Sequence, residues 1–397
     1  MAKTASAHDT QPHQFEPLLP QSGLEAMRER ARAIAARSSQ LGSSAHPDTI
    51  AGLRELVREM NSYYSNRIEG QGTHPRNIAR ALRRDFSDQP DIARLQRLAL
   101  AHIEAERALE AAVAGGVAAL TSDFVRLAHH ELYSRLEAAD RLTPEGRVIE
   151  PGRWRDDRRE VGRHEPPRPE ALPAFLARFD AFYGKDAARE EPLVAIAAAH
   201  QRMAWIHPFI DGNGRACRLQ THAALWPMSH GLWSVSRGLA RRRDEYYERL
   251  DAADSPRQGD LDGRGNLSER QLRAWCDWFL GVCEDQVSFM AGLLALGGMK
   301  KRIEALVTFR AAHDKQVRME AVLPLYHLFL AGPTPRGEFQ QMTGLESRTA
   351  RKLLSRLIET GLVASESHVA PVRLAFPLDS LQFLLPGLYP EADAPEA

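Results

Sequence analysis

The sequence predicts a mainly α-helical protein with a smaller second domain near its C-terminal end. Apolar residues recur at three- and four-residue steps through most of the chain up to residue 295, which indicates amphipathic helices. After residue 299 the pattern changes to three short helices followed by two short strands. With 397 residues, 43% hydrophobic and 26% charged, the chain is typical of a soluble globular protein and long enough for two or three cores.

The overall charge excludes any general argument for a charged partner. Lys+Arg and Asp+Glu both number 52, so no net field favours nucleic acid, a membrane surface or an acidic substrate. Three cysteines without a CxxC pair indicate a reducing compartment rather than a disulfide scaffold or a structural zinc site. No apolar run approaches about 18 residues, and the first residues lack a signal-peptide core. We therefore expect a cytoplasmic protein without membrane contact.

The first part of the chain divides into an arm and a helical body. Residues 1–46 are polar at their start, and we expect a mobile arm and lead-in. A helix over 47–70 begins at Pro47, which a first helical turn tolerates, and Gly70 is placed to stop it. Periodicity predicts further helices at 75–86, 89–114, 121–137, 168–184, 191–205, 214–226, 237–253 and 268–295.

One segment of the helical body has a different pattern. Residues 151–163 (PGRWRDDRREVGR) are short and strand-like between Gly152 and Gly162, which predicts a lone β-hairpin. Together with the helices, this hairpin belongs to one predicted domain over 47–298.

The second domain is predicted over 299–385. Helices at 322–331, 335–343 and 347–360, then a hairpin from 361–363 and 369–376, follow the order of a winged helix. The third helix carries a basic face that fits a DNA major groove, formed by Arg348, Arg351, Lys352 and Arg356. Dimerisation and protein docking are the alternative roles for such a module. We expect a frayed tail at 386–397.

Residues 207–218 (HPFIDGNGRACR) concentrate more chemistry than any other window. The turn Gly212-Asn213-Gly214 can adopt positive φ angles and leave backbone N–H groups free at the start of a helix, which favours a phosphate. Arg215 and Arg218, three residues apart, can bracket further phosphate oxygens. A His-Pro or Gly-Asn-Gly sequence alone indicates only a turn, but the combination predicts an anion site.

Two further side chains of this window suggest catalysis. A carboxylate beside phosphates, here Asp211, calls for a cation between them, and Mg²⁺ is the usual one. His207 lies four residues earlier and can accept a proton near neutral pH. The window therefore predicts a base, a metal ligand, an anion nest and two cationic clamps.

The window matches without departure the motif HPFx[D/E]GNGRxxR of the Fic (Fido) family, and the chain resembles that family over about residues 47 to 295. The resemblance implies a Fic-type helical core in which 151–163 is a flap that clamps the target segment. It also implies transfer of a nucleotide, usually AMP from ATP, to a Ser, Thr or Tyr hydroxyl of a target protein and of the enzyme itself. Winged-helix tails also occur in this family.

The same resemblance assigns a role to each residue of the motif. His207 would be the base, Asp211 would bind Mg²⁺, and Gly212, Asn213 and Gly214 would form the anion hole. Arg215 would hold the α/β-phosphates and Arg218 the γ-phosphate, while Phe209 would anchor the loop.

A second motif, SNRIEG at 65–70, ends the helix that begins at Pro47. Glu69 occupies the last turn, where the helix dipole disfavours a negative charge. SNRIEG resembles the family's inhibitory motif, [S/T]xxxE[G/N]. That resemblance implies an ion pair between Glu69 and Arg218 that restrains the enzyme, and Ser65 is within helical reach to orient the Glu69 carboxylate.

Other candidate positions carry less specific signals. The segment at 244–247 resembles the wall of an adenine pocket, so Tyr246 or Tyr247 would face the base, and one of them is expected in the core. Trp154 would pack over the target segment or serve the core. Cys217, between the arginines, is expected to be a packing residue.

Several functional alternatives stay open at the level of sequence. The motif specifies phosphate geometry better than the base, so another nucleotide donor or removal of AMP is an alternative. A nucleotide-sensing, DNA-binding regulator is another, although a pure sensor needs no base such as His207. The sequence also leaves a homodimer open.

Overall fold

The computed structural model describes residues 10–160, 164–184 and 191–389. It is mainly α-helical, which confirms the predicted fold class, and β1 and β2 form a two-stranded sheet within these residues. The helices of the body are α1 (Leu24–Leu41), α2 (Pro47–Ile68), α3 (Pro75–Leu82), α4 (Pro90–Ala114), α5 (Ser122–Tyr133), α6 (Leu172–Tyr183), α8 (Pro192–Ile206), α9 (Asn213–Ser229), α10 (Val235–Arg241), α11 (Arg243–Ala253), α12 (Glu269–Leu294) and α13 (Leu296–His313).

Helix α8 forms the centre of the body. Almost every one of its residues is buried, and it packs against α6, α9, α11 and α12. A helix that is apolar on all sides is stable only where neighbours surround it. The end of α8 and the start of α9 are therefore held rigidly, and the segment between them is the 207–218 motif.

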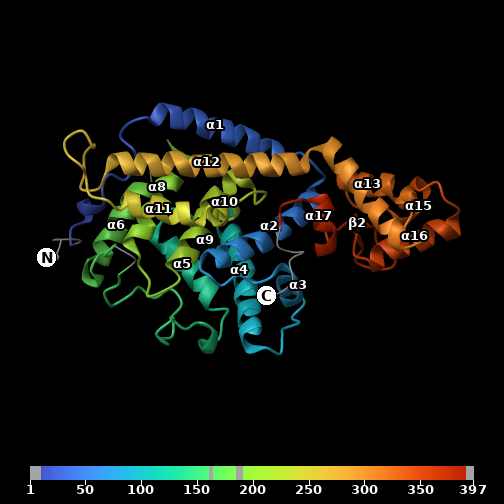
Figure 1. The fold of residues 1–397 in the computed structure, drawn as a ribbon, viewed down its shortest axis with the longest axis horizontal. Helices are drawn as coiled ribbons and strands as arrows, with labels where there is room; N and C mark the ends of the chain where they lie inside the picture. Colours follow the sequence, from blue (N-terminus) through green and yellow to red (C-terminus); the bar gives the residue numbers. More distant parts are fainter. Residues whose placement is uncertain (1–9, 161–163, 185–190, 390–397) are drawn as a thin grey trace.

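Helix α2 packs beside α4, α9 and α10 and brings its C-terminal end to the motif (Figure 1). Pro47 is its first residue, and the ring of His46 accepts a hydrogen bond from the Asp48 N–H at the N-terminus. Gly70, just beyond its end, has φ +73°, a conformation in which glycine is favoured. The predicted start and stop signals therefore both operate.

Residues 10–46, which belong to the predicted mobile arm and lead-in, contribute buried side chains to the core of the helical body. Phe15 is fully buried against Phe175 and Trp205, with ring centroids 5.4 and 5.8 Å apart. Helix α1 then runs along α12 (Figure 1). Its buried apolar residues lie a full seven residues apart, at Met27, Ile34 and Leu41, and such a narrow stripe is easily missed.

The hairpin predicted at 151–163 is not formed in its described part. Residues 153–160 contain no strand, and 161–163 lie outside the described residues. The segment instead attaches to the motif: the Arg155 N–H donates to Pro208 O at 2.9 Å. Its polar groups are thus satisfied by the neighbouring loop rather than by strand pairing.

Several helix boundaries differ from the prediction. The predicted helix at 237–253 is two helices, α10 and α11, because Arg242 leaves the helical conformation at φ −121° and ψ 40°. The predicted helix at 121–137 ends at Tyr133. Helix α13 was not predicted and connects the body to the C-terminal elements.

The C-terminal elements lie together at one end of the molecule (Figure 1). They comprise α14 (Val322–Ala331), α15 (Arg336–Met342), α16 (Ser347–Glu359), the antiparallel strands β1 (Val363–Ala364) and β2 (Arg373–Leu374), and α17 (Leu381–Leu384). This order agrees with the predicted sequence of elements, whereas a winged-helix role stays a prediction. On the basic face of α16, Arg356 is already paired with Asp314 at 2.6 Å.

The predicted tail is partly folded. Leu388 and Tyr389 are buried, and Leu388 O accepts a hydrogen bond from the Tyr64 hydroxyl of α2 at 3.2 Å. Residues 390–397 lie outside the described residues. In the part of the chain that the structure describes, no single helix is long and apolar enough to span a membrane, and α12 and α13 meet the criterion only as a pair bent by 61°.

Candidate active site

The loop between α8 and α9 has a conformation that few residues adopt. His207 ends α8 in the left-handed region at φ +48°, which is uncommon outside glycine and indicates backbone strain held by the surroundings. The Asn213 side chain closes the loop: its Oδ1 accepts from Phe209 N–H and its Nδ2 donates to Phe209 O, each at 2.9 Å. Asn213 thus shapes the loop with its amide and leaves its backbone N–H for a ligand.

The N-terminus of α9 has the features of an anion site. The first intrahelical hydrogen bond runs from Ala216 N–H to Gly212 O, so the N–H groups of residues 213–215 precede it. Among the described residues, the N-cap position Gly212 provides no side-chain cap. Gly212, at φ +78°, lies directly against the Tyr133 ring, and a Cβ there would collide with it. The three backbone N–H groups of residues 213–215 and the positive end of the helix dipole therefore converge at the N-terminus of α9.

Glu69 occupies that place. A Cβ on Gly214 would collide with the Glu69 carboxylate and lie 3.0 Å from Arg218 Nη1. Arg218 Nη2 donates to Glu69 Oε1 at 2.6 Å. The carboxylate from the end of α2 therefore contacts both the first turn of α9 and its second arginine.

Ser65 acts on Arg218 rather than on Glu69. Its Oγ accepts from Arg218 Nε and its carbonyl oxygen accepts from Arg218 Nη2, both at 3.0 Å. Within the described residues Ser65 forms no hydrogen bond with the Glu69 carboxylate, contrary to the predicted orienting role. Because Arg218 is buried, its guanidinium needs several hydrogen-bond acceptors. The Ser65 hydroxyl is one of these acceptors.

The electrostatics of the pair favour both charged forms. Burial alone would raise the pKa of Glu69, but Arg218 and then Arg215 outweigh it and hold that pKa below its usual value. Burial would lower the pKa of Arg218, whereas Glu69 raises it above its usual value. Both groups are therefore ionised near neutral pH.

Arg215 is held by other partners. Its Nη1 donates to Gln71 Oε1 at 2.7 Å and its Nη2 to the Tyr133 hydroxyl at 2.8 Å. Its Nε is buried without a hydrogen-bond partner among the described residues. Arg215 thus keeps one buried donor unused beside the anion site.

His207 is neutral in this environment. Burial, then the positive charge of Arg155 and of His164, lowers the pKa of His207 to about 3. Arg155 Nε donates to His207 O at 2.7 Å, and Arg155 also binds Asp157 O and Pro167 O. A neutral imidazole has an unprotonated ring nitrogen that can accept a proton.

Asp211 is suited to a cation. It is half-buried, and its Oδ1 accepts from the Gly212 N–H. Within the described residues no positively charged side chain forms an ion pair with it. A half-exposed carboxylate beside a phosphate site matches the oxygen donors that Mg²⁺ uses.

Aromatic stacking anchors the loop from beneath. Phe209 is fully buried and stacks on the His129 ring at 3.9 Å between centroids and on Trp154 at 4.9 Å. His129 Nδ1 accepts from Gly152 N–H, and its Nε2 pairs with Asp211 O. Trp154 therefore packs on the loop anchor, and His129 links the loop to the 151–160 segment.

The two tyrosines of α11 differ in burial. Tyr246 is buried, with its hydroxyl 2.9 Å from His200 Nε2, so it belongs to the core. Tyr247 is 41% exposed, and its hydroxyl donates to Ile68 O. Of the two, only Tyr247 faces an open side near Glu69, which leaves it as the adenine-pocket candidate.

Cys217 is a packing residue, in agreement with its expected role. It is 2% exposed, its thiol lies 3.3 Å from His200 O, and burial raises the pKa of that thiol to about 12.

Sequence reasoning missed four residues that hold the site: Arg155, Tyr133, His129 and Gln71. Gln71 directly follows SNRIEG, so adjacency was a signal for it. The others carry no local signal, because their partners lie far away in sequence. Arg243 also donates to Ile68 O at 2.8 Å and so caps the end of α2.

Comparison with known sequences identifies the central part of the chain. The Fic/DOC family matches residues 119–225. A protein adenylyltransferase Fic of Nematostella vectensis is 36% identical over 119 residues, which are 30% of this chain and 27% of the relative. The corresponding protein of Drosophila yakuba is 32% identical over 114 residues, 28% and 22% of the two chains. The matched part of this chain thus spans about a quarter of the length of these curated relatives.

Solved structures show the same fold over a longer stretch. A Fic family protein from Desulfovibrio desulfuricans covers 90% of this chain and 98% of its own, with a TM-score of 0.54 and 19% identity. Fic-1 from C. elegans covers 68% of this chain and 73% of its own, with a TM-score of 0.53 and 16% identity. The chain therefore carries a Fic/DOC family domain at residues 119–225, which contains the motif loop and the first turns of α9.

Proposed function

We propose that this protein transfers AMP from ATP to a Ser, Thr or Tyr hydroxyl of a target protein, and that Glu69 restrains the transfer. The observation that carries the proposal is the occupied anion site. The motif supplies a helix N-terminus, two arginines and a neutral histidine, and an internal carboxylate lies where a phosphate would bind. The names of the adenylyltransferase relatives support the same reaction.

The reaction follows from the positions of these groups. His207 takes the proton of the target hydroxyl, whose oxygen bonds to the α-phosphorus of ATP as the bond to pyrophosphate breaks. A polyphosphate beside His207 brings negative charge that opposes the effect of Arg155. This charge acts against the lowering of the His207 pKa, whose largest cause is burial, and makes the imidazole a better proton acceptor.

Charge that develops on the phosphates meets preorganised donors. The free N–H groups at the start of α9 and the guanidinium groups of Arg215 and Arg218 surround the site. Mg²⁺, for which Asp211 is the candidate ligand, would supply further neutralisation when bound. These contacts support binding of the phosphates of the nucleotide. The choice of nucleoside depends on other groups, such as Tyr247.

The restraint follows from competition for one cation. Arg218 cannot serve the Glu69 carboxylate and a γ-phosphate fully at the same time. The ion pair is 2.6 Å long, and the carboxylate contacts Gly214, so a γ-phosphate must displace Glu69 to bind. Nucleotide bound without that displacement would be placed unproductively.

The experiment uses purified full-length protein, Mg²⁺ and ATP labelled at the α-phosphate. Wild type, Glu69→Gly, Glu69→Gln and Glu69→Gly/His207→Ala are compared for label on protein. We expect label to rise at least about tenfold in Glu69→Gly, to rise less in Glu69→Gln, and to vanish in the double variant.

Two further arms separate the alternatives. Unchanged or lower labelling in Glu69→Gly would contradict the restraint. Label from γ-labelled ATP, or from another α-labelled nucleoside triphosphate only, would point to a different donor. Loss of label from pre-modified protein on adding Mg²⁺ would point to AMP removal instead.

A further inference from the structure

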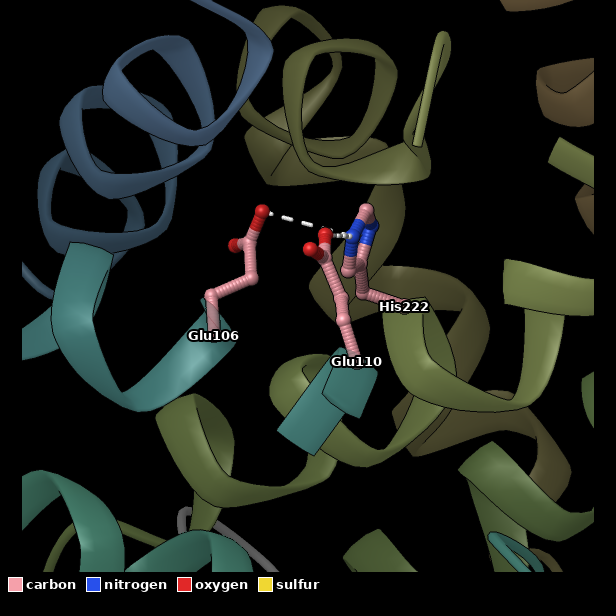
Figure 2. Close-up of side chains that lie close together, drawn as sticks. All are labelled: Glu106, Glu110 and His222. Carbon is pink, nitrogen blue, oxygen red and sulfur yellow. Dashed lines mark hydrogen bonds and ion pairs between the residues drawn. The ribbon is translucent and has the colours of Figure 1, made fainter. Parts of the chain in front are cut away.

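Glu106, Glu110 and His222 meet in the interior, away from the motif loop. Figure 2 shows both glutamates of α4 and the histidine of α9 pointing toward one another. His222 Nε2 lies 2.9 Å from Glu110 Oε1 and 3.3 Å from Glu106 Oε1. One ligand atom from each residue lies within 4.8 Å of the others, and all three residues are at most 3% exposed.

Besides His222, which lies in ion-pair range of both carboxylates, one arginine contacts the cluster among the described residues. Two carboxylates are buried here, and Arg58 is the cation that contacts one of them, with Nε 2.8 Å from Glu110 Oε2. Arg58 also pairs with the half-exposed Glu55 at 2.5 Å. Its charge is thus shared between two glutamates, and a dication at the cluster would balance the buried pair.

An unpartnered histidine provides a second, independent observation. His102 is 1% exposed, and within the described residues neither of its ring nitrogens has a hydrogen-bond partner. Its Nδ1 points at the cluster, 3.9 Å from Glu106 Oε2. A buried imidazole without a partner is costly, and a metal held by Glu106 would give it one.

The outer contacts also suit a metal. The Asn61 amide lies at the cluster, with Nδ2 2.8 Å from Glu106 Oε1 and 3.4 Å from His222 Nδ1, while its Oδ1 has no partner among the described residues. A metal on His222 Nε2 leaves the proton on Nδ1. If the amide turned over, its oxygen could accept that proton, as outer partners of metal-bound histidines commonly do.

We propose that Glu106, Glu110 and His222 bind a divalent transition metal, with Zn²⁺ the best match to mixed imidazole and carboxylate ligands; His102 lies beside Glu106 but outside this three-residue group. The site is distinct from Asp211. His222 lies one helical turn beyond Arg218 on α9, and Asn61 lies one turn before Ser65 on α2. The metal would therefore brace α4 and α9 one turn from the Ser65–Arg218 contact.

The test is metal analysis of the purified full-length protein after dialysis without chelator. Wild type is compared with His222→Gln, Glu106→Gln and, as a control, the exposed His313→Gln. We expect about one Zn²⁺ per chain in wild type and control, and about a tenth or less in the two cluster variants. The Asp211→Ala variant is expected to keep the Zn²⁺ of the cluster, because Asp211 does not belong to it.

A second measurement does not depend on the variants folding. Chelator-treated wild type is titrated with Zn²⁺ and, separately, with Mn²⁺, while its melting temperature is followed. We expect a rise of about 5 °C with Zn²⁺. X-ray absorption is expected to show imidazole nitrogen and oxygen ligands without sulfur.

Two results would overturn the proposal. Wild type with no bound metal and no thermal shift would mean that the cluster is only an ion-pair network. Equal metal content in folded His222→Gln and wild type would place the metal elsewhere.

Discussion

Glu69 contacts the same groups that a phosphate would use, and its charge is stabilised there. Its carboxylate binds Arg218 at 2.6 Å and touches Gly214 at the first turn of α9. Alone at the end of α2 it would oppose the helix dipole, whereas at the start of α9 the dipole favours it. A residue that is unfavourable in its own helix is thus stabilised by another helix, which is typical of a functional contact.

The restraint by Glu69 is expected to be independent of pH in the neutral range. Arg218 and Arg215 hold the pKa of Glu69 below its usual 4.5, although burial alone would raise it. A carboxyl with a lowered pKa keeps its ion pair above that pKa and loses it only as the pH falls through it. We expect the ratio of labelling rates of Glu69→Gly and wild type to stay constant from about pH 6 to 8.

That ratio is measured with α-labelled ATP in one mixed buffer at constant ionic strength. A ratio that falls toward one as the pH drops from 8 to 6 would show that a different titrating group releases the restraint.

Gly214→Ala separates the two occupants of the anion site. The new methyl group collides with the Glu69 carboxylate, but it also fills the space that a phosphate needs. We expect Gly214→Ala to weaken ATP binding by about tenfold or more and to give no activation. The double variant Glu69→Gly/Gly214→Ala is expected to stay inactive.

Calorimetry with ATP and the labelling assay check both points. Gly337→Ala, in open space on α15, serves as the control. Activation by Gly214→Ala alone would mean that the phosphates lie elsewhere.

At the scale of elements, the ends of α2 and α8 are fixed by side chains from remote segments. Arg243 and Tyr247 of α11 both donate to Ile68 O, the carbonyl that precedes Glu69. Arg155 donates to His207 O and, through its N–H, to Pro208 O. Each helix end therefore has its position set by a second element.

Arg155→Ala is expected to impair catalysis more than nucleotide binding. Without the guanidinium, His207 O and Pro167 O each lose a donor, so the base is less well placed. In the Glu69→Gly background we expect kcat to fall about 10- to 100-fold with little change in KM for ATP. Steady-state labelling at several ATP concentrations measures both.

The matched control is Arg153→Ala, because Arg153 is exposed and pairs only with Asp156 within the described residues. An equal loss in both variants would show that the effect comes from removal of a positive charge near the site.

At the scale of the whole molecule, the C-terminal end of the described chain packs on α2. Tyr389 is buried against Tyr63, with centroids 5.9 Å apart, and Leu388 O binds the Tyr64 hydroxyl. The helix that carries Glu69 is therefore held in part by residues more than three hundred positions away in sequence.

Tyr389→Ala is expected to lower the free energy of unfolding by about 3 kcal/mol, because it removes a buried aromatic ring. Tyr389→Phe is expected to be neutral or stabilising, since the Tyr389 hydroxyl is buried without a hydrogen-bond partner among the described residues. Denaturant unfolding measures both, with the fully exposed Leu261→Ala as control. A destabilised Tyr389→Phe would show that the hydroxyl has a partner.

Features that depend on neighbouring residues could be predicted from the amino-acid sequence alone. The start of α2 at Pro47, its stop at Gly70, and the bounds of α14 follow from local turn chemistry and short-range periodicity. The motif residues 207–218 are likewise local, because a tight turn and a helix start place them together.

Which distant side chains meet could not be predicted in this way, because it depends on how the helices pack. In the folded protein Ser65 accepts a hydrogen bond from Arg218, and Arg155 donates one to His207 O. Tyr246 is buried, and α1 packs along α12. Periodicity describes one helix at a time, whereas these contacts depend on how helices pack and on which buried charge finds an acceptor. The residue types of the site can therefore be predicted from a short segment of sequence, whereas their contacts depend on the packing of the whole fold.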